Sequence, residues 1–218
     1  MTTKSNTSAK TLELVQLSLF AALIIIMAFT PFIGYIPLGF TRATLIHVPV
    51  IIGSLLLGPK KGAILGALFG LTSLINNTVN PTVTSFVFTP FYSGGNIFSL
   101  IICFMPRILI GVFPYYVYKL MVSASQNKSQ NSVAFAAAGI VGSLTNTLLV
   151  MNLIYVFFNE SYAAANAGKI VEGALYKFIL SVICINGIPE AIVAAILVTA
   201  VCKVMVKLKI GKVQTNLS

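Results

Sequence analysis

The chain has 218 residues, of which 57% are hydrophobic and only 8% are charged, whereas an ordinary soluble domain carries roughly 25% charged residues. Its mean hydropathy is +0.97. A water-soluble domain of this size cannot bury so much apolar surface, so the composition predicts an integral membrane protein and excludes a soluble globule. The chain has 14 Lys and Arg residues but only four acidic residues, so the net charge is +10.

The composition also excludes several kinds of chemistry. One histidine, His47, and no Asp leave almost no material for a zinc site or a Ser-His-Asp triad. The chain has no phosphate-binding loop of the form G-x-x-x-x-G-K-[ST], so it does not hydrolyse ATP by that route. We therefore expect no catalytic residue, no cofactor and no metal.

Apolar runs predict an all-α bundle of six transmembrane helices within a single membrane domain, residues 1–218. A spanning helix needs about 20 apolar residues. In chain order, the predicted spans are about 12–30, 45–57, 62–75, 97–120, 133–158 and 172–201. The runs 45–57 and 62–75 are short, and Gly58-Pro59-Lys60-Lys61 separates them, so we interpret them as two short spans.

Three features interrupt this pattern. A connection containing Gly and Pro, Phe32 to Thr44, follows the first span. An uncharged loop rich in Asn, Thr and Phe, Asn76 to Asn96, precedes the fourth, and its composition favours a lid that folds over the bundle. Within the last span, Asn186-Gly187-Ile188-Pro189 predicts a break in the helix.

The basic residues predict the orientation. With a cytoplasmic N-terminus, ten of the 14 fall on the cytoplasmic side: Lys4, Lys10, Lys60, Lys61, Lys119, Lys128, Lys203, Lys207, Lys209 and Lys212. Arg42, Lys169 and Lys177 fall on or near the outer side. The positive-inside rule then places both termini in the cytoplasm. Topology explains most of the basic excess, so the partner it indicates is the lipid bilayer and not a nucleic acid.

Glycines at four-residue spacing form a ridge on the third predicted helix. Gly58, Gly62, Gly66 and Gly70 share one face, which lets another helix approach closely. Two interpretations remain open. The ridge packs against a neighbouring span of the same chain, or it slides against a partner subunit.

Two ionisable residues lie at membrane depth. Arg107 follows Ile97 by ten residues, about 15 Å along a helix, and Glu190 lies well inside the last span. A charge at this depth needs a partner or a watery cavity. Arg107 and Glu190 form a structural ion pair, or Arg107 meets an anionic group on a ligand, since a planar guanidinium binds a carboxylate through two hydrogen bonds. The two interpretations are compatible, because Glu190 can hold Arg107 in place until an anion arrives.

Amides accompany these charges. Asn146, Asn152 and Asn186 should face the interior, because Asn is costly against lipid. They serve either interhelical hydrogen bonding or a polar ligand site. The full set of residues that we expect to bind a ligand is Arg107, Asn146, Asn186, Glu190, His47, Asn76, Asn77, Asn80, Tyr92 and Asn96.

At these residues the chain resembles the substrate-binding S component of an energy-coupling-factor (ECF) vitamin transporter, over about residues 12–203. The segments that carry the resemblance are Ile46–Gly62, Leu71–Asn77, Pro106–Gly111, Gly142–Thr147 and Asn186–Glu190. Asn76–Pro81 and Ser85–Phe88 look most like the pantothenate-specific branch.

The resemblance implies a six-helix subunit of the bacterial cytoplasmic membrane that binds a vitamin from outside and topples to carry it inward. The implied partners are a transmembrane coupling protein (the T component) and two ABC-type ATPases, which hydrolyse the ATP. Small residues on the first helix would form the docking face, here Ser18, Ala21 and Ala22, with the ridge Gly62, Gly66 and Gly70 as a further candidate.

Other functions are weighed against this one. The nearest is an S component for another vitamin or precursor, such as hydroxymethylpyrimidine, pyridoxine or folate. An ion-coupled secondary transporter could use Glu190 as its coupling site. An intramembrane enzyme has too few catalytic groups in this sequence.

Overall fold

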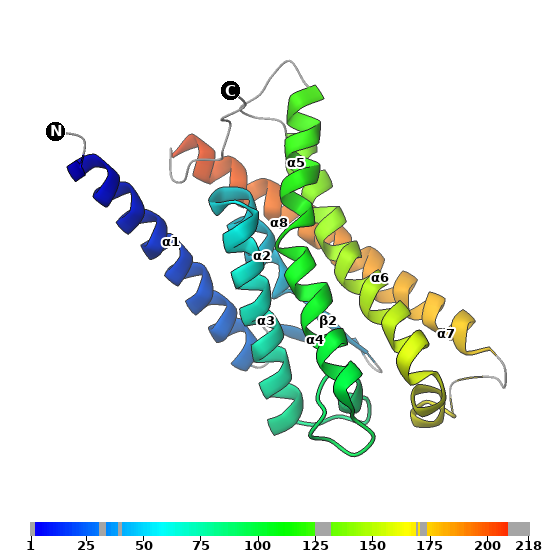
Figure 1. The fold of residues 1–218 in the computed structure, drawn as a ribbon. Helices are drawn as coiled ribbons and strands as arrows, with labels where there is room; N and C mark the ends of the chain where they lie inside the picture. Colours follow the sequence, from blue (N-terminus) through cyan, green and yellow to red (C-terminus); the bar gives the residue numbers. More distant parts are fainter. Residues whose placement is uncertain are drawn as a thin grey trace.

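The computed structural model describes residues 3–30, 34–38, 41–124, 132–168, 170 and 174–208. Four lysines of the predicted topology, Lys128, Lys169, Lys209 and Lys212, lie outside these residues. The helices form an elongated bundle (Figure 1). They are α1 Thr3–Phe29, α2 His47–Leu57, α3 Pro59–Val79, α4 Ile97–Ile110, α5 Phe113–Ala124, α6 Ser132–Ala165, α7 Leu175–Val182 and α8 Ile188–Lys207.

Five helical segments are long and apolar enough to cross a membrane. These are Lys10–Phe29, Pro59–Val79, Ile97–Ala124, Ser132–Ala165 and Leu175–Lys207. The protein is therefore a multi-pass membrane protein, as its composition predicts. The remaining apolar helix, α2, has only 11 residues, about 16 Å, which is roughly half the thickness of the hydrocarbon core.

The chain passes back and forth between two ends of the bundle (Figure 1). The N-terminal end of α1, the α2–α3 turn and the C-terminal ends of α5 and α8 lie at one end, which we call the lysine end. It carries Lys60, Lys61, Lys119, Lys203 and Lys207. The C-terminal end of α3 and the segment up to α4 lie at the opposite end, which we call the loop end.

The predicted connection Phe32 to Thr44 contains an element that the sequence did not predict. Strands β1, Tyr35–Leu38, and β2, Thr41–Thr44, pair antiparallel in a hairpin. Tyr, Ile and Thr in these segments favour extended backbone, and the pairing provides hydrogen-bond partners for their backbone groups. The hairpin leads directly into α2.

The longer spans are interrupted. The predicted span 97–120 consists of α4 and α5, which meet at Gly111-Val112. The predicted break in the last span is confirmed: a π-helical turn, Ile183–Gly187, separates α7 from α8, and Pro189 lies in the first turn of α8. In α6, non-helical dihedral angles at Phe158 mark a kink.

The glycine ridge packs inside the molecule, against α4. Gly62, Gly66 and Gly70 are buried. A Cβ at Gly66 would overlap the carbonyl oxygen of Arg107, and one at Gly62 would overlap that of Gly111. Because α4 covers the ridge, the interpretation as internal packing holds, and these three glycines are not available to a partner subunit in this conformation.

Two apolar clusters fill the interior, and a polar layer separates them. On α4, Arg107 lies between Ile102 of one cluster and Ile110 of the other. On α6, Asn146 lies between Ala138 and Val150. On α8, Glu190 lies between the loop-end cluster, which reaches Ile183, and Ala194 of the lysine-end cluster. Three helices thus contribute polar side chains at the same depth.

Replacing Gly66 by Ala should destabilise the bundle. The methyl group would force α3 away from α4 at the backbone of Arg107, and overpacking costs about 1–3 kcal/mol. This exceeds the gain of about 1 kcal/mol that Gly→Ala brings to a helix interior. The measurement is the melting temperature in detergent. Gly168→Ala is the control, because nothing lies within 4 Å of its Cβ; equal melting temperatures for the two variants would contradict the packing argument.

Candidate ligand-binding site

Arg107 is the cation of the polar layer. It lies in the last turn of α4 and is 6% exposed. Its Nη1 donates a hydrogen bond of 2.6 Å to the carbonyl oxygen of Ile102. The guanidinium carbon lies 5.6 Å from the ring centroid of Phe69 and 5.0 Å from that of Phe88. The side chain thus points from α4 toward the loop end, and two aromatic rings stabilise its charge by cation–π interaction.

Glu190 joins three elements. Its side chain is 6% exposed, in the first turn of α8. Oε1 accepts a hydrogen bond of 2.6 Å from the backbone N–H of Thr44 in β2, and Oε2 accepts one of 3.2 Å from the hydroxyl of Thr147 in α6. These bonds satisfy a buried carboxylate and hold the hairpin against α6 and α8.

Arg107 and Glu190 do not form the direct ion pair that was one of the two predictions for them. Both residues lie in the described part of the chain, and the ion pair found there joins Lys61 to Glu13 at the lysine end. The two groups interact electrostatically over a longer distance. The Glu190 carboxylate accepts hydrogen bonds from Thr44 and Thr147 and not from the Arg107 guanidinium. Because Thr44 belongs to β2, Glu190 holds the hairpin in position.

The π turn brings a further amide to this layer. Asn186 and Gly187 are buried. A Cβ at Gly187 would lie 3.2 Å from Cγ2 of Thr147, so the absence of a side chain lets the turn approach α6 closely. Because Pro189 has no N–H, it cannot donate a regular helical hydrogen bond after the turn. The turn thus packs against Thr147, which also bonds to Glu190, and it buries Asn186.

Three other side chains of this layer have buried polar atoms that lack hydrogen-bond partners among the described residues. They are both ring nitrogens of His47, Oγ of Ser143 and Oδ1 of Asn146. His47 is the first residue of α2 and is fully buried. The backbone of Thr44 lies near its ring but outside hydrogen-bond geometry. Such groups are costly unless something bonds to them.

Not every polar group of α6 belongs to this layer. The Thr145 hydroxyl donates to the carbonyl oxygen of Val141 at 2.7 Å, and Asn152 Nδ2 donates to that of Leu148 at 2.7 Å. Both bonds stay within the helix. These two residues therefore have a local structural explanation, and Asn152 is partly exposed rather than buried with the other predicted amides.

The predicted lid segment packs over the loop end of the bundle. Ser85 begins a short 3-10 helix, Ser85–Val87. Its hydroxyl accepts from the backbone N–H of Thr82 at 2.8 Å and donates to Oδ1 of Asn77 at 2.9 Å. The ring of Phe86 packs on that of Phe158 of α6, with 5.7 Å between the ring centroids. From this segment Phe88 reaches Arg107.

The structure brings together only part of the predicted ligand-binding set. Arg107, Asn146, Asn186, Glu190 and His47 are all buried in the polar layer. The other five residues have separate positions at the loop end. Asn76 and Asn77 lie on α3 rather than in a loop, Asn80 Nδ2 donates to Asn76 Oδ1 at the surface, Tyr92 is exposed, and Asn96 caps α4 together with Ser99.

Two contributions were missed by sequence reasoning. Thr44 acts through its backbone N–H, for which a sequence carries no signal. Phe69 lies among many apolar residues of α3, and only the tertiary packing shows that its ring faces Arg107. The layer as a whole offers a guanidinium, an imidazole, amides and hydroxyls between apolar walls, which suits a small polar anion.

The sequence from residue 12 to residue 202 matches the family described as ECF transporter, substrate-specific component. The chain belongs to this family. An S component of this kind is a transport subunit and not an enzyme. One relative is the pantothenic acid transporter PanT of Lactococcus lactis subsp. cremoris, 34% identical over 205 residues, which are 91% of this chain and 96% of the relative. Another is the pantothenate transporter PanT of Leuconostoc mesenteroides subsp. mesenteroides, 29% identical over 203 residues, with 90% and 93% covered.

The predicted docking residues of this S component differ in exposure. Ser18 and Ala22 are exposed and Ala21 is half-buried. They lie on α1, whose remaining outer face is apolar. Large exposed side chains on α1 include Leu14, Val15, Leu19, Leu23 and Ile26. This face is open in the isolated subunit, in contrast to the glycine ridge.

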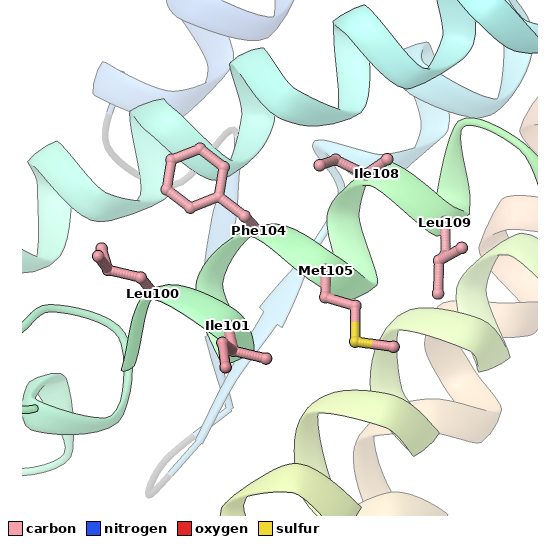
Figure 2. A pocket seen from close by; sticks show the side chains of 6 residues that line it. All are labelled: Leu100, Ile101, Phe104, Met105, Ile108 and Leu109. Carbon is pink, nitrogen blue, oxygen red and sulfur yellow. The ribbon is translucent and has the colours of Figure 1, made fainter. Parts of the chain in front are cut away.

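An apolar hollow on α4 has a different character (Figure 2). Its six residues all come from one helix: Leu100, Ile101, Phe104, Met105, Ile108 and Leu109. Ile101 and Met105 are exposed, so the hollow opens on the surface of the bundle. Without polar groups it cannot recognise a polar anion, and we separate it from the ligand site of the S component.

Replacing Ser85 by Ala should loosen the lid segment. The change removes one acceptor and one donor that hold residues 77–85 together, and a buried group left without its partner costs about 1–3 kcal/mol. Hydrogen–deuterium exchange of residues 80–96 should become faster. Ser93→Ala is the matched control, because Ser93 is exposed in the same segment. Equal exchange in the two variants would show that this network does not order the segment.

Proposed function

We propose that this chain is the substrate-binding subunit of an ATP-driven ECF importer for pantothenate. We choose pantothenate as the vitamin because two relatives are named as pantothenate transporters. The observation that carries the proposal is Arg107, a buried cation held at membrane depth in a layer of hydrogen-bonding groups. Pantothenate offers one carboxylate, two hydroxyls, an amide and a branched apolar carbon, which together match such a layer.

Arg107 binds the carboxylate of the vitamin in this proposal. A planar guanidinium pairs with a carboxylate through parallel hydrogen bonds, and burial strengthens the attraction. The rings of Phe69 and Phe88 already contact the guanidinium, so little side-chain entropy is lost when the anion binds. The other residues of the layer, Asn146, Asn186 and His47, serve the uncharged part of the ligand.

The segment 80–96 is the lid. It carries Phe88, which covers Arg107, so the segment must move for an anion to reach the guanidinium from the loop end. Asn77 and Ser85 fasten its base, and Asn76, Asn80, Tyr92 and Asn96 lie where an entering ligand first meets the protein.

The membrane topology that we propose has six crossings, with both termini in the cytoplasm. α1 and α3 both run from the lysine end toward the loop end (Figure 1). The hairpin and α2 together must therefore carry the chain back across, which makes the second crossing despite the shortness of α2. Lys60, Lys61, Lys119, Lys203 and Lys207 mark the cytoplasmic side.

The partners in this proposal are a T component and two ABC-type ATPases, in the bacterial cytoplasmic membrane. ATP hydrolysis takes place in the ATPases. The exposed small residues Ser18 and Ala22 lie in a broad apolar face of α1, which gives a T component a surface for close helix packing.

Replacing Arg107 by Ala should lower pantothenate affinity by at least about 100-fold, the scale of a lost buried charge-assisted contact. Isothermal titration of the detergent-solubilised subunit measures the affinity. Pantothenol, in which a hydroxymethyl group replaces the carboxylate, tests the role directly. The wild type should prefer pantothenate strongly, and Arg107→Ala should bind both compounds with similar weak affinity.

Lys177→Ala, an exposed cation at the loop end, is the control and should bind pantothenate normally. Undiminished affinity of Arg107→Ala would refute the carboxylate role. If the wild type bound a neutral vitamin and ignored pantothenate, the substrate itself would be wrong. Proton-driven uptake without ATPases would favour a secondary transporter instead.

Cysteine labelling of intact cells tests the topology. In a Cys184→Ser background, the Ser93→Cys variant should react with a membrane-impermeant maleimide added outside, because Ser93 lies at the loop end. The Ser123→Cys variant, at the lysine end of α5, should react only after the membrane is permeabilised. The reverse pattern would invert the proposed orientation.

A further inference from the structure

Besides Arg107 and Glu190, three side chains of the polar layer have buried polar atoms without a hydrogen-bond partner among the described residues; Gln16, Tyr118 and Thr199 have such atoms elsewhere on α1, α5 and α8. His47 and Ser143 are fully buried and Asn146 is 8% exposed. The two ring nitrogens, Oγ and Oδ1 find no hydrogen-bond partner among the described residues. Polar atoms buried in this way are seldom left unbonded in a folded protein, unless they serve a ligand, a water or an ion. We therefore ask what chemistry they would bind.

The packing of α2 on α6 places these residues together. The two helices run in opposite directions (Figure 1). Ile51 of α2 meets Gly142 of α6, since a Cβ at Gly142 would lie 2.5 Å from Ile51 Cδ1. One helical turn toward the loop end leads from Ile51 to His47 and from Gly142 to Asn146. This step places His47 and Asn146 at a similar depth where α2 packs on α6, and Ser143 follows Gly142 on α6.

The hydrogen-bonding capacity of this group indicates what it would bind. A neutral imidazole has one donor and one acceptor, a serine hydroxyl has both functions, and Oδ1 of Asn146 only accepts. A carboxylate or phosphate offers acceptors alone, so it would leave Asn146 Oδ1 unsatisfied. An alcohol both donates and accepts, and therefore matches the group.

We propose that His47, Ser143 and Asn146 bind the hydroxyl-bearing half of the ligand and determine specificity for it, while Arg107 holds the carboxylate at the other end. This inference rests on the proposed pantothenate function and deepens it. Glu190 supports the arrangement from the side, because it fixes the backbone of Thr44, next to His47.

The test compares pantothenate with N-(3,3-dimethylbutanoyl)-β-alanine. This analogue keeps the carbon skeleton, the amide and the carboxylate, and lacks both hydroxyls. Isothermal titration gives the affinity of each compound for the wild type and for the His47→Leu, Asn146→Leu and Ser143→Ala variants. Thr145→Val is the matched control, since the Thr145 hydroxyl is bonded within its own helix.

The wild type should bind the analogue about 100-fold or more weakly than pantothenate, because unpaired buried polar groups reject a ligand that lacks hydroxyls. Asn146→Leu and His47→Leu should each lose about 10- to 100-fold in pantothenate affinity and keep or improve the affinity for the analogue. The preference for hydroxyls should therefore shrink in these variants and stay unchanged in Thr145→Val.

Two results would overturn the inference. One is an unchanged preference in the three variants, and the other is an equal loss of affinity for both compounds, which would mean a purely structural role. Ser143→Ala removes only one oxygen atom, so its affinities for the two compounds can be measured even if the larger replacements unfold the protein. Failure of the wild type to bind pantothenate at all would instead refute the proposed function, so the two failures are distinguishable.

Discussion

The burial of one guanidinium at membrane depth is the constraint on which the rest of this structure depends. A charge in the hydrocarbon region is costly unless the protein surrounds it. Arg107 meets this requirement through the Ile102 carbonyl and the rings of Phe69 and Phe88. α3 can approach its backbone only because Gly66 has no side chain. Gly66 of α3 and the aromatic residues around Arg107 thus both help to accommodate the buried guanidinium.

Glu190 has a complementary role in the same layer. Its carboxylate accepts hydrogen bonds from Thr44 and Thr147 and so connects the hairpin, α6 and α8 at one point. The longer-range attraction to Arg107 adds to these bonds. Because Glu190 is held by hydrogen bonds rather than by a direct ion pair, an anion that binds Arg107 need not displace it. A polar layer between two apolar clusters is well suited to a ligand that is charged at one end and hydroxylated at the other.

Hydrogen bonding at the loop end links the lid segment to this layer. Asn77, Thr82 and Ser85 fasten the beginning of the segment, and Ser99 at the start of α4 donates to the carbonyl oxygen of Phe86 at 2.7 Å. The cover over Arg107 is therefore anchored on both α3 and α4, and it meets the guanidinium through Phe88 alone among its aromatic residues. The composition of the segment predicted that it packs on the bundle, and the structure shows that hydrogen bonds to Asn77 of α3 and Ser99 of α4 hold it there.

The sequence by itself determined the membrane class, the apolar character of the long helices, the helix break near Asn186 and the position of Arg107 about ten residues into an apolar helix. Hydropathy, helix breakers and the rise per residue are local properties, so they can be summed along the chain. Only the tertiary structure decided that the glycine ridge faces α4, that Glu190 bonds to Thr44 and Thr147, and that the ring nitrogens of His47 are buried without a hydrogen-bond partner among the described residues. These outcomes depend on the rotation and relative depth of helices distant in sequence, which no local pattern specifies. Asn76 and Asn186 look alike in sequence, and only the packing separates a surface amide from one in the buried layer.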